Sequence, residues 1–390
     1  MNSLLPTESI GTDSVESFEA LSLKPALLRG IFSYGFEQPS AIQQHAIPPL
    51  LLGRDVIGQA QSGSGKTAAF AIALLEQVQT KPRVCQGLIL VPTRELAQQV
   101  ATVVDQLAQY MDLRCHCCIG GTRVREDIRA VEAGINVIVG TPGRVFDLIS
   151  RKVLTLQHLR MLVIDEADLM LDRGFQDQIK LIVATVPGNT QIALFSATLS
   201  TEVLALSQLF LQNPVRILVE KEEINLKGIQ QYYIVLEKDT WRNDTIRDLY
   251  SHLDIAQAIL YCNSRQRAEA LASYLIEQDF AVSLIHGELD PGTRDSVMQG
   301  FRTGETRVLV TTDLLARGID VQQVSVVINY DFPKREETYM HRIGRSGRCG
   351  RKGVAISLVT DQDYDALKTL QSHYNANIVE LPSDLADLLS

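Results

Sequence analysis

Short apolar runs recur along the chain, and each is followed by a polar turn and then by a segment with helical periodicity. The runs do not alternate between apolar and polar residues, which is typical of strands buried on both faces of a parallel sheet. The pattern predicts strands at 88–91, 137–139, 161–164, 192–195, 258–261, 308–310, 326–328 and 354–359. Because strands and helical segments alternate, we expect a doubly wound α/β architecture.

The clearest helical pattern covers 94–110, where apolar residues at 96, 100, 103, 104 and 107 fall on one face. Thr93 stands directly before this segment, and a threonine hydroxyl can cap the first turn of a helix. We therefore expect a helix that begins after Thr93 and packs one side against the sheet.

The two halves of the chain resemble each other. The sequence NVIVGTPGR in the first half is matched by RVLVTTDLLARG in the second, and RMLVIDEAD is matched by SVVINYD. We interpret this as a degenerate tandem duplication. The alternation of strand and helix is lost near 213–228, so we predict domains at 18–216 and 229–390, a linker at 217–228 and a disordered leader at 1–17.

Composition fits this organisation, because 390 residues with 45% hydrophobic and 21% charged residues suffice for two cores. The net charge of -9 argues weakly against a nucleic-acid partner, so any RNA site should be a local surface of backbone amides and a few arginines. No apolar run is long enough to predict a membrane span, and the N-terminus does not resemble a secretory signal.

The cluster Cys115, His116, Cys117 and Cys118 raises the possibility of a metal site. Zinc sites usually need a second Cys/His pair, and the sequence has none at zinc spacing. We therefore favour a buried strand with reduced thiols, which is typical of a reducing compartment.

A phosphate-binding loop is predicted after an expected strand at 55–59. The loop is AQSGSGKT, and a helical run follows it. Gly63 and Gly65 let backbone amides approach phosphate oxygens, Lys66 can reach the β- and γ-phosphates, and the hydroxyl of Thr67 can bind magnesium. A glycine- and serine-rich surface turn is the alternative, which the Lys-Thr spacing disfavours. The candidate ATP-binding residues here are Ala60, Gln61, Ser62, Gly63, Ser64, Gly65, Lys66 and Thr67.

Two adjacent carboxylates follow the predicted strand at 161–164. At the carboxyl end of a buried strand they should point into the crevice where ligands bind in open α/β sheets, rather than form an acidic surface turn. Asp165 can hold magnesium, partly through water, and Glu166 can orient and deprotonate the attacking water.

The tetrapeptide DEAD at 165–168, together with AQSGSGKT, resembles the DEAD-box RNA helicases. Further motifs of that family stand in the same order. They are GFEQPSAIQ at 35–43 with Phe18 upstream, PTRELA at 92–97, GG at 120–121, TPGR at 141–144, SAT at 196–198, YCNSR at 261–265, TTDLLARGID at 311–320 and HRIGRSGR at 341–348. The resemblance runs from about Phe18 to the C-terminus, and the ordered set is far more specific than any single motif.

The resemblance implies two tandem RecA-like domains, each a mostly parallel sheet with helices on both faces, and ATP and Mg²⁺ as ligands. It implies that Phe36 stacks on the base, that Gln38 and Gln43 contact it, and that Asp320 binds the ribose. Arg345 and Arg348 would be arginine fingers. The implied catalytic residues are Lys66, Asp165, Glu166, Arg345 and Arg348, with Thr67 and Asp165 holding magnesium.

The resemblance also implies an RNA surface that contacts sugars and phosphates without reading bases. The implied contacts are Pro92, Thr93, Arg94, Gly121, Thr141, Arg144, Asn263, Arg265, Thr311 and Arg317. For a single arginine such as Arg144, a solvated face or an ion pair is the alternative. Ser196, Thr198 and His341 would couple the ATP and RNA sites. Pro291 stands where the family usually has a glutamine, so that RNA contact is lost.

We take YCNSRQRA at 261–268 as the counterpart of the phosphate loop in the second domain. It has no Gly-Lys-Thr, so we expect the second domain to complete the first domain's nucleotide site without binding ATP of its own. Closure of a hinge around ATP would then hold RNA.

Within the family, the short core and the end ELPSDLADLLS resemble the translation-initiation branch. An RNA clamp of the exon-junction type is the alternative, and a DNA helicase is a third hypothesis. The favoured branch implies single-stranded or duplex RNA as ligand, a HEAT-repeat scaffold as partner, and a cytoplasmic monomer with no membrane association.

Overall fold

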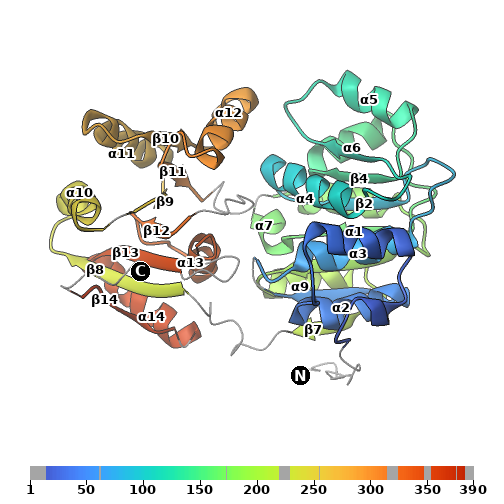
Figure 1. Ribbon diagram of the computed structural model, residues 1–390, viewed down its shortest axis with the longest axis horizontal. Helices are drawn as coiled ribbons and strands as arrows, with labels where there is room; N and C mark the ends of the chain where they lie inside the picture. The colour runs from blue at the N-terminus through green and yellow to red at the C-terminus, as the bar shows by residue number, and fades with distance from the viewer. Residues whose placement is uncertain are drawn as a thin grey trace. The chain divides into compact units, whose positions relative to one another are not determined.

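The computed structural model describes residues 15–60, 63–172, 174–218, 229–253, 255–313, 324–346, 353–374 and 376–382. The chain forms two compact units, Met1–Val219 and Glu220–Ser390 (Figure 1). Residues 1–14 of the predicted leader and most of the predicted linker lie outside the described residues. Strand β7 (Val215–Leu218) belongs to the first unit's sheet and extends two residues into the range that we assigned to the linker.

The first unit is built on a seven-stranded parallel sheet in the order β3-β4-β2-β5-β6-β1-β7. Its other strands are β1 Val56–Gln59, β2 Gly87–Leu90, β3 Cys115–Cys118, β4 Val137–Gly140, β5 Met161–Ile164 and β6 Gln191–Ser196. Its α-helices are α1 Pro25–Tyr34, α2 Ala41–Leu51, α3 Lys66–Gln77, α4 Arg94–Leu107, α5 Val124–Glu132, α6 Pro142–Ser150, α7 Ala167–Asp172, α8 Gln176–Val183 and α9 Thr201–Gln208. One core lies under α1 to α4, and α6 to α9 cover the opposite face.

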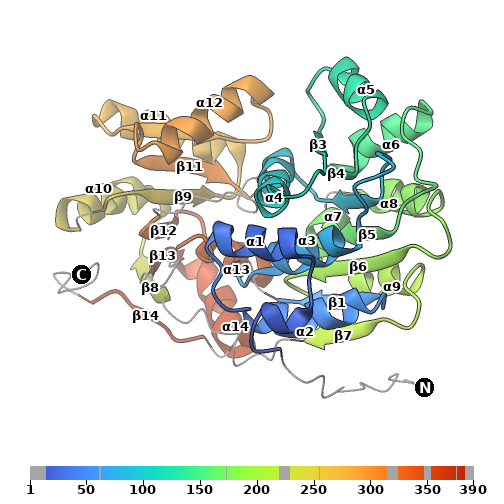
Figure 2. The same cartoon turned by 45° about the vertical axis from the view of Figure 1, so that its right-hand side comes forward.

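The second unit repeats this plan with a parallel sheet in the order β10-β11-β9-β12-β13-β8-β14. Its strands are β8 Ile229–Leu236, β9 Ala258–Cys262, β10 Val282–Ile285, β11 Val308–Thr312, β12 Val326–Asn329, β13 Gly353–Thr360 and β14 Ile378–Glu380. Its α-helices are α10 Arg242–His252, α11 Arg265–Glu277, α12 Pro291–Arg302, α13 Glu336–Ile343 and α14 Tyr364–Tyr374 (Figure 2). Helices α10 and α11 pack on one face and α12 to α14 on the other.

The predicted α/β architecture is confirmed, and each of the ten predicted strands, including those at 55–59 and at the cysteine cluster, overlaps an observed one. Thr93 caps α4 as predicted, because its Oγ1 accepts a hydrogen bond from the Leu96 amide at 3.1 Å. The helix ends at Leu107, three residues before the predicted end. The sequence pattern missed β7, β8, β10 and β14. In β8 only Gln231 and Leu236 are buried, and in β10 buried residues alternate with half-buried ones, so neither strand forms a continuous apolar run.

The assignment of YCNSRQRA as the second phosphate-loop position was wrong. Comparison of the two strand orders places β8 where β1 lies in the first sheet, and β9 where β2 lies. The true counterpart of the phosphate loop is therefore the turn between β8 and α10, and residues 261–268 correspond to the segment after β2. The two other matches between the halves are confirmed, because β4 and β11 occupy the same position in their respective sheets, and so do β5 and β12.

Among the described residues, no helix combines the length and the apolar character that crossing a membrane requires.

Candidate nucleotide and RNA sites

The phosphate loop of the first unit is held in a conformation that requires glycine. Gly63 and Gly65 have φ of 87° and 100°, which residues with a Cβ rarely adopt. A Cβ on Gly65 would lie 2.6 Å from Nε2 of Gln43 and 2.8 Å from Oγ of Ser40. Nε2 of Gln43 donates to the Gly65 carbonyl at 3.2 Å, so helix α2 is tied to the loop. Gln61 and Ser62 lie outside the described residues.

Gly65→Ala is expected to weaken ATP binding by about five- to 100-fold, because forcing φ and displacing Gln43 cost roughly 1–3 kcal/mol and 1.4 kcal/mol is a factor of ten. Titration with a fluorescent ATP analogue measures the effect. Gly188→Ala is the matched control, since a Cβ there meets no atom within 4 Å. Equal affinities in the two variants would contradict this geometry.

Lys66 is a buried cation whose ammonium group has no hydrogen-bonding partner among the described residues. It is the first residue of α3 and is 5% exposed, and its Nζ has no hydrogen bond to the described residues. The nearest carboxylate oxygen, Oε1 of Glu166, is 3.7 Å away. Burying an ammonium group without hydrogen bonds is costly, so this position suits an anionic ligand such as a nucleotide phosphate.

The two carboxylates at the end of β5 are also buried. Burial raises the pKa of Asp165 to about 7, while Lys66 opposes the shift and Glu166 adds to it. Glu166 has φ of 53°, and a left-handed residue other than glycine stores strain that is often found at functional sites. Carboxylate and hydroxyl oxygens are the ligands that Mg²⁺ prefers, so Asp165 and Thr67 fit the predicted metal.

The residues predicted to contact the base lie before and within the start of α2. Phe36 is half-buried and packs on Tyr34 and Phe18, with ring centroids 4.6 and 6.4 Å apart. Gln38 is exposed. Oε1 of Gln43 accepts from the Ser40 amide at 2.9 Å, so this side chain caps α2 as well as bonding the loop. The contacts of these residues with adenine remain predictions.

The SAT motif and the DEAD motif form one hydrogen-bonded network. Oγ of Ser196 donates to the Thr198 carbonyl at 2.7 Å and accepts from the Asp168 amide at 3.3 Å. Oγ1 of Thr198 donates to Oδ2 of Asp168 at 2.9 Å. A displacement of the DEAD residues at the end of β5 would therefore move the segment after β6. Such a link is what coupling between the ATP and RNA sites requires.

The RNA candidates of the first unit are engaged with the chain itself. Arg94 donates to the carbonyl of Gly120. Arg144 is buried, forms an ion pair with Asp127, and donates to the carbonyl of Thr122 at 2.9 Å. The two arginines thus hold the turn at 119–122, and Arg144 adopts the ion pair that was the alternative to a free phosphate donor.

The remaining first-unit candidates frame this turn. Gly121 has φ of 81° and is exposed, Thr141 precedes α6, and Pro92 and Thr93 precede α4. Direct contacts of these residues with RNA remain predictions.

The cysteine cluster forms strand β3, which confirms the predicted strand, but only Cys118 is buried and the other three residues are half-buried. His116, Cys118 and Asp127 offer ligand atoms within 4.8 Å of one another, a grouping that the cysteine spacing could not reveal. Asp127 is already bonded to Arg144 and to Nε2 of His116, the latter at 2.8 Å. Burial raises the pKa of the Cys118 thiol well above its ordinary value, which disfavours the thiolate that a metal needs. The contacts therefore favour an ion-pair network.

In the second unit, Thr311 is buried and its hydroxyl donates to the Thr312 carbonyl at 3.1 Å. Sequence reasoning missed Thr312, whose buried Oγ1 has no hydrogen bond to the described residues. Arg345 is buried, and its Nε donates to the His341 carbonyl at 3.3 Å. Arg317, Asp320 and Arg348, which were predicted to contact RNA, ribose and phosphate respectively, lie outside the described residues.

Sequence reasoning also missed Arg342, which is buried and holds three segments together. Its Nε donates to Oδ1 of Asp313 at 2.6 Å, its Nη2 to Oδ1 of Asn263 at 2.7 Å, and its Nη1 to the Asp331 carbonyl at 2.7 Å. Its position as the first arginine of HRIGRSGR was the available signal.

Comparison with known proteins matches both units. The family model for the DEAD/DEAH box helicase matches residues 40–206, and that for the helicase conserved C-terminal domain matches residues 241–350. Eukaryotic initiation factor 4A of Cryptosporidium parvum is 53% identical, covering 98% of this chain and 94% of the relative. The ATP-dependent RNA helicase eIF4A of Schizosaccharomyces pombe is 52% identical, covering 96% of each chain.

Solved structures show the same fold. Dbp5 of S. cerevisiae, bound to RNA and ADP BeF3, superposes with a TM-score of 0.89 at 36% identity, covering 96% of this chain and 97% of that one. Its two RecA-like domains correspond to the two units described above. With more than half of its residues identical to initiation-factor helicases along almost its whole length, the chain belongs to the DEAD/DEAH box helicase family.

Proposed function

We propose that this chain hydrolyses ATP to ADP and phosphate while it clamps RNA and unwinds short RNA duplexes, and that it does so on mRNA leaders during translation initiation. The observation that carries the ATPase assignment is the buried ammonium of Lys66 beside two buried carboxylates, in a loop that only glycines can form. The initiation role rests on the similarity to initiation factor 4A. The relatives reported above favour this branch over the exon-junction alternative.

The residues of the first unit divide the chemistry among them. The backbone of Gly63 to Gly65 and the Lys66 ammonium bind the phosphates and stabilise the charge that develops on them. Asp165 and Thr67 would hold Mg²⁺, which would supply positive charge to offset that of the phosphates. Glu166 orients the attacking water and takes its proton as the water oxygen bonds to the γ-phosphorus, while the bond from that phosphorus to the bridging oxygen breaks and ADP leaves.

The second unit supplies cations and RNA contacts. Arg345 and Arg348 act as arginine fingers on the γ-phosphate, and Asp320 binds the ribose. Asn263, Arg265, Thr311 and Arg317 contact the RNA backbone. Dbp5, a similar two-domain chain, was solved with both RNA and a nucleotide analogue, which supports this shared use of the two units.

The proposed setting follows from the same resemblance. A HEAT-repeat initiation scaffold is the expected partner, and the chain is expected to be monomeric and cytoplasmic. Copurification from cells, followed by identification of the bound partner, tests the initiation role separately from the catalytic one.

The catalytic proposal is tested by ATPase and unwinding assays on the intact chain. We expect single-stranded RNA to stimulate hydrolysis, and ATP to be needed for separating a short duplex. At physiological salt, single-stranded DNA should stimulate far less, because the 2′-hydroxyl is part of the recognition. Equal stimulation by DNA would favour a DNA helicase, and no stimulation by RNA would contradict the proposal.

A further inference from the structure

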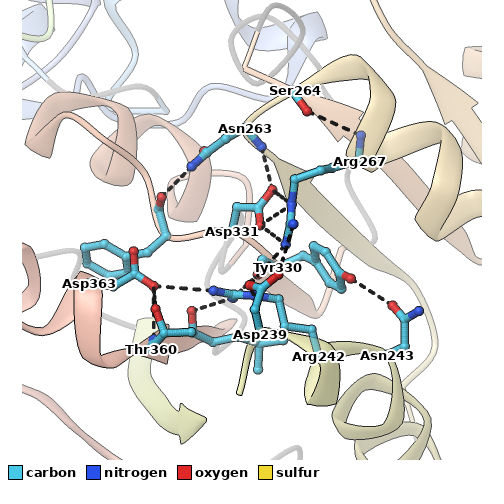
Figure 3. Close-up of polar contacts among 12 residues, drawn as sticks. Asp239, Arg242, Asn243, Asn263, Ser264, Arg267, Tyr330, Asp331, Thr360 and Asp363 are labelled. Carbon is cyan, nitrogen blue, oxygen red and sulfur yellow. Dashed lines mark hydrogen bonds and ion pairs between the residues drawn. The ribbon is translucent and has the colours of Figure 1, made fainter. Parts of the chain in front are cut away.

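The second unit has an ion-pair network where the first unit has its nucleotide site (Figure 3). Helix α10 begins with Arg242, just as α3 begins with Lys66. Unlike Lys66, Arg242 uses each of its guanidinium nitrogens. Nε donates to Oδ1 of Asp239 at 2.6 Å, Nη1 to the Leu358 carbonyl at 3.0 Å, and Nη2 to Oδ2 of Asp363 at 3.4 Å. The protein's own carboxylates therefore balance the charge of Arg242, at the position where a bound nucleotide would balance the charge of Lys66 in the first unit.

Asp331 connects this network to the end of β9. It follows β12, the counterpart of the strand that carries Asp165 and Glu166, and it is buried. Nε of Arg267 donates to its two oxygens at 2.8 and 2.9 Å, and Nη1 of Arg267 donates to Oδ2 of Asp239 at 3.1 Å. Figure 3 shows Arg267 lying between these two carboxylates.

The same carboxylate fixes the turn that carries two RNA candidates. Oδ2 of Asp331 accepts a hydrogen bond from the backbone N–H of Asn263 at 2.9 Å. In the Asn263 side chain, Nδ2 donates to the Phe332 carbonyl at 2.8 Å and Oδ1 accepts from Nη2 of Arg342. Asn263 is therefore bound into the protein, whereas the side chain of Arg265 is 44% exposed and paired only with surface glutamates among the described residues.

We propose that Asp331 is a positioning residue for RNA binding. Its carboxylate accepts hydrogen bonds from the backbone N–H of Asn263 and from the Arg267 guanidinium. These bonds fix the turn so that the Arg265 side chain can contact the RNA backbone. Because the carboxylates that balance the network belong to the protein, the turn is held whether or not ATP is bound. The inference rests on the proposed function and names a residue that this function had not used.

The test uses the intact chain, ATP and a single-stranded uridine oligomer as the probe. Asp331→Ala should raise the KM for the oligomer about tenfold. Asp331→Asn should raise it less, because the amide oxygen of asparagine can still accept from the backbone N–H of Asn263. The kcat at saturating oligomer and the KM for ATP should stay within about twofold, as expected when an interaction made equally in ground and transition states is lost. Arg267→Met, at a half-exposed position, gives a second route to the same loss if Asp331 variants fold poorly.

Asp363→Ala is the matched control. It removes a carboxylate from the far side of the same network, where Asp363 contacts Arg242 and Thr360 and not the turn. It should lower the unfolding temperature and leave the KM for the oligomer unchanged. A rise in this KM equal to that of Asp331→Ala would overturn the proposal, because it would mean that the network acts only through stability.

A double-mutant cycle with Arg265→Ala separates positioning from an independent effect. If Asp331 acts through Arg265, the double variant should bind the oligomer no more weakly than the worse single variant. Fully additive losses would overturn the proposal. Failure of the proposed function is seen separately, as absence of RNA-stimulated ATPase in the unmodified chain.

Discussion

Lys66→Met is expected to reduce ATP hydrolysis by at least about 10²-fold, as removal of one preorganised charge-stabilising donor typically does. The same change should leave the nucleotide-free protein as stable as the unmodified chain, or more stable. Lys66 is buried, its Nζ makes no hydrogen bond to the described residues, and its ion pair with Glu166 is long at 3.7 Å, so we expect the burial of its charge to cost more stability than the pair returns until a phosphate binds. Methionine has a similar length and no charge to bury.

Thermal unfolding with and without ATP measures both effects. The unmodified chain should gain stability from saturating ATP by mass action, and Lys66→Met should lose this gain. Lys180→Met, at an exposed position near the end of α8, is the control and should behave like the unmodified chain. A nucleotide-free protein that is strongly destabilised by Lys66→Met would show that the ion pair with Glu166 outweighs the cost of burying the Lys66 charge, which would contradict this expectation.

Glu166→Gln is expected to lower the rate of hydrolysis by about 10² to 10⁴-fold, the range for loss of a general base. Glutamine keeps the shape of the side chain and its strained backbone position, but it cannot accept the proton of the attacking water. ATP binding should therefore persist, and RNA bound in the presence of ATP should be released more slowly.

Equilibrium ATP binding, single-turnover hydrolysis and RNA dissociation in the presence of ATP test this assignment together. Glu126→Gln, on the exposed surface of α5, is the control for loss of one negative charge. Hydrolysis at the full rate by Glu166→Gln would rule out Glu166 as the base, even if Lys66 behaved as expected.

The sequence predicted the central strands well and the outer ones poorly, for a physical reason. Strands such as β5 are buried on both faces and appear as uninterrupted apolar runs. Strand β8 contains Gln230, Gln231, Tyr232 and Tyr233, and most of its residues are only partly buried or exposed. Because β8 was not recognised, the second phosphate-loop position was assigned one strand too late.

The candidate site was predictable where neighbouring residues share one task. Spacing along the chain identified Lys66 and Glu166, which the fold brings to 3.7 Å. Spacing could not reveal the ion pair between Asp127 and Arg144, or the hydrogen bond from the Asn263 backbone to Asp331. In both cases the partners come from different elements of the fold. Such pairings follow from strand order, which no local pattern encodes.

We expect one ATP to bind in the first unit and its hydrolysis to require arginines of the second. The decisive test is RNA-stimulated ATP hydrolysis by the intact chain, measured beside Arg345→Ala and Arg348→Ala together with the ATP-binding stoichiometry. We predict one ATP per chain in all three proteins and a loss of about 10³-fold or more in stimulated hydrolysis in each variant. Turnover at the unmodified rate in both variants would contradict it.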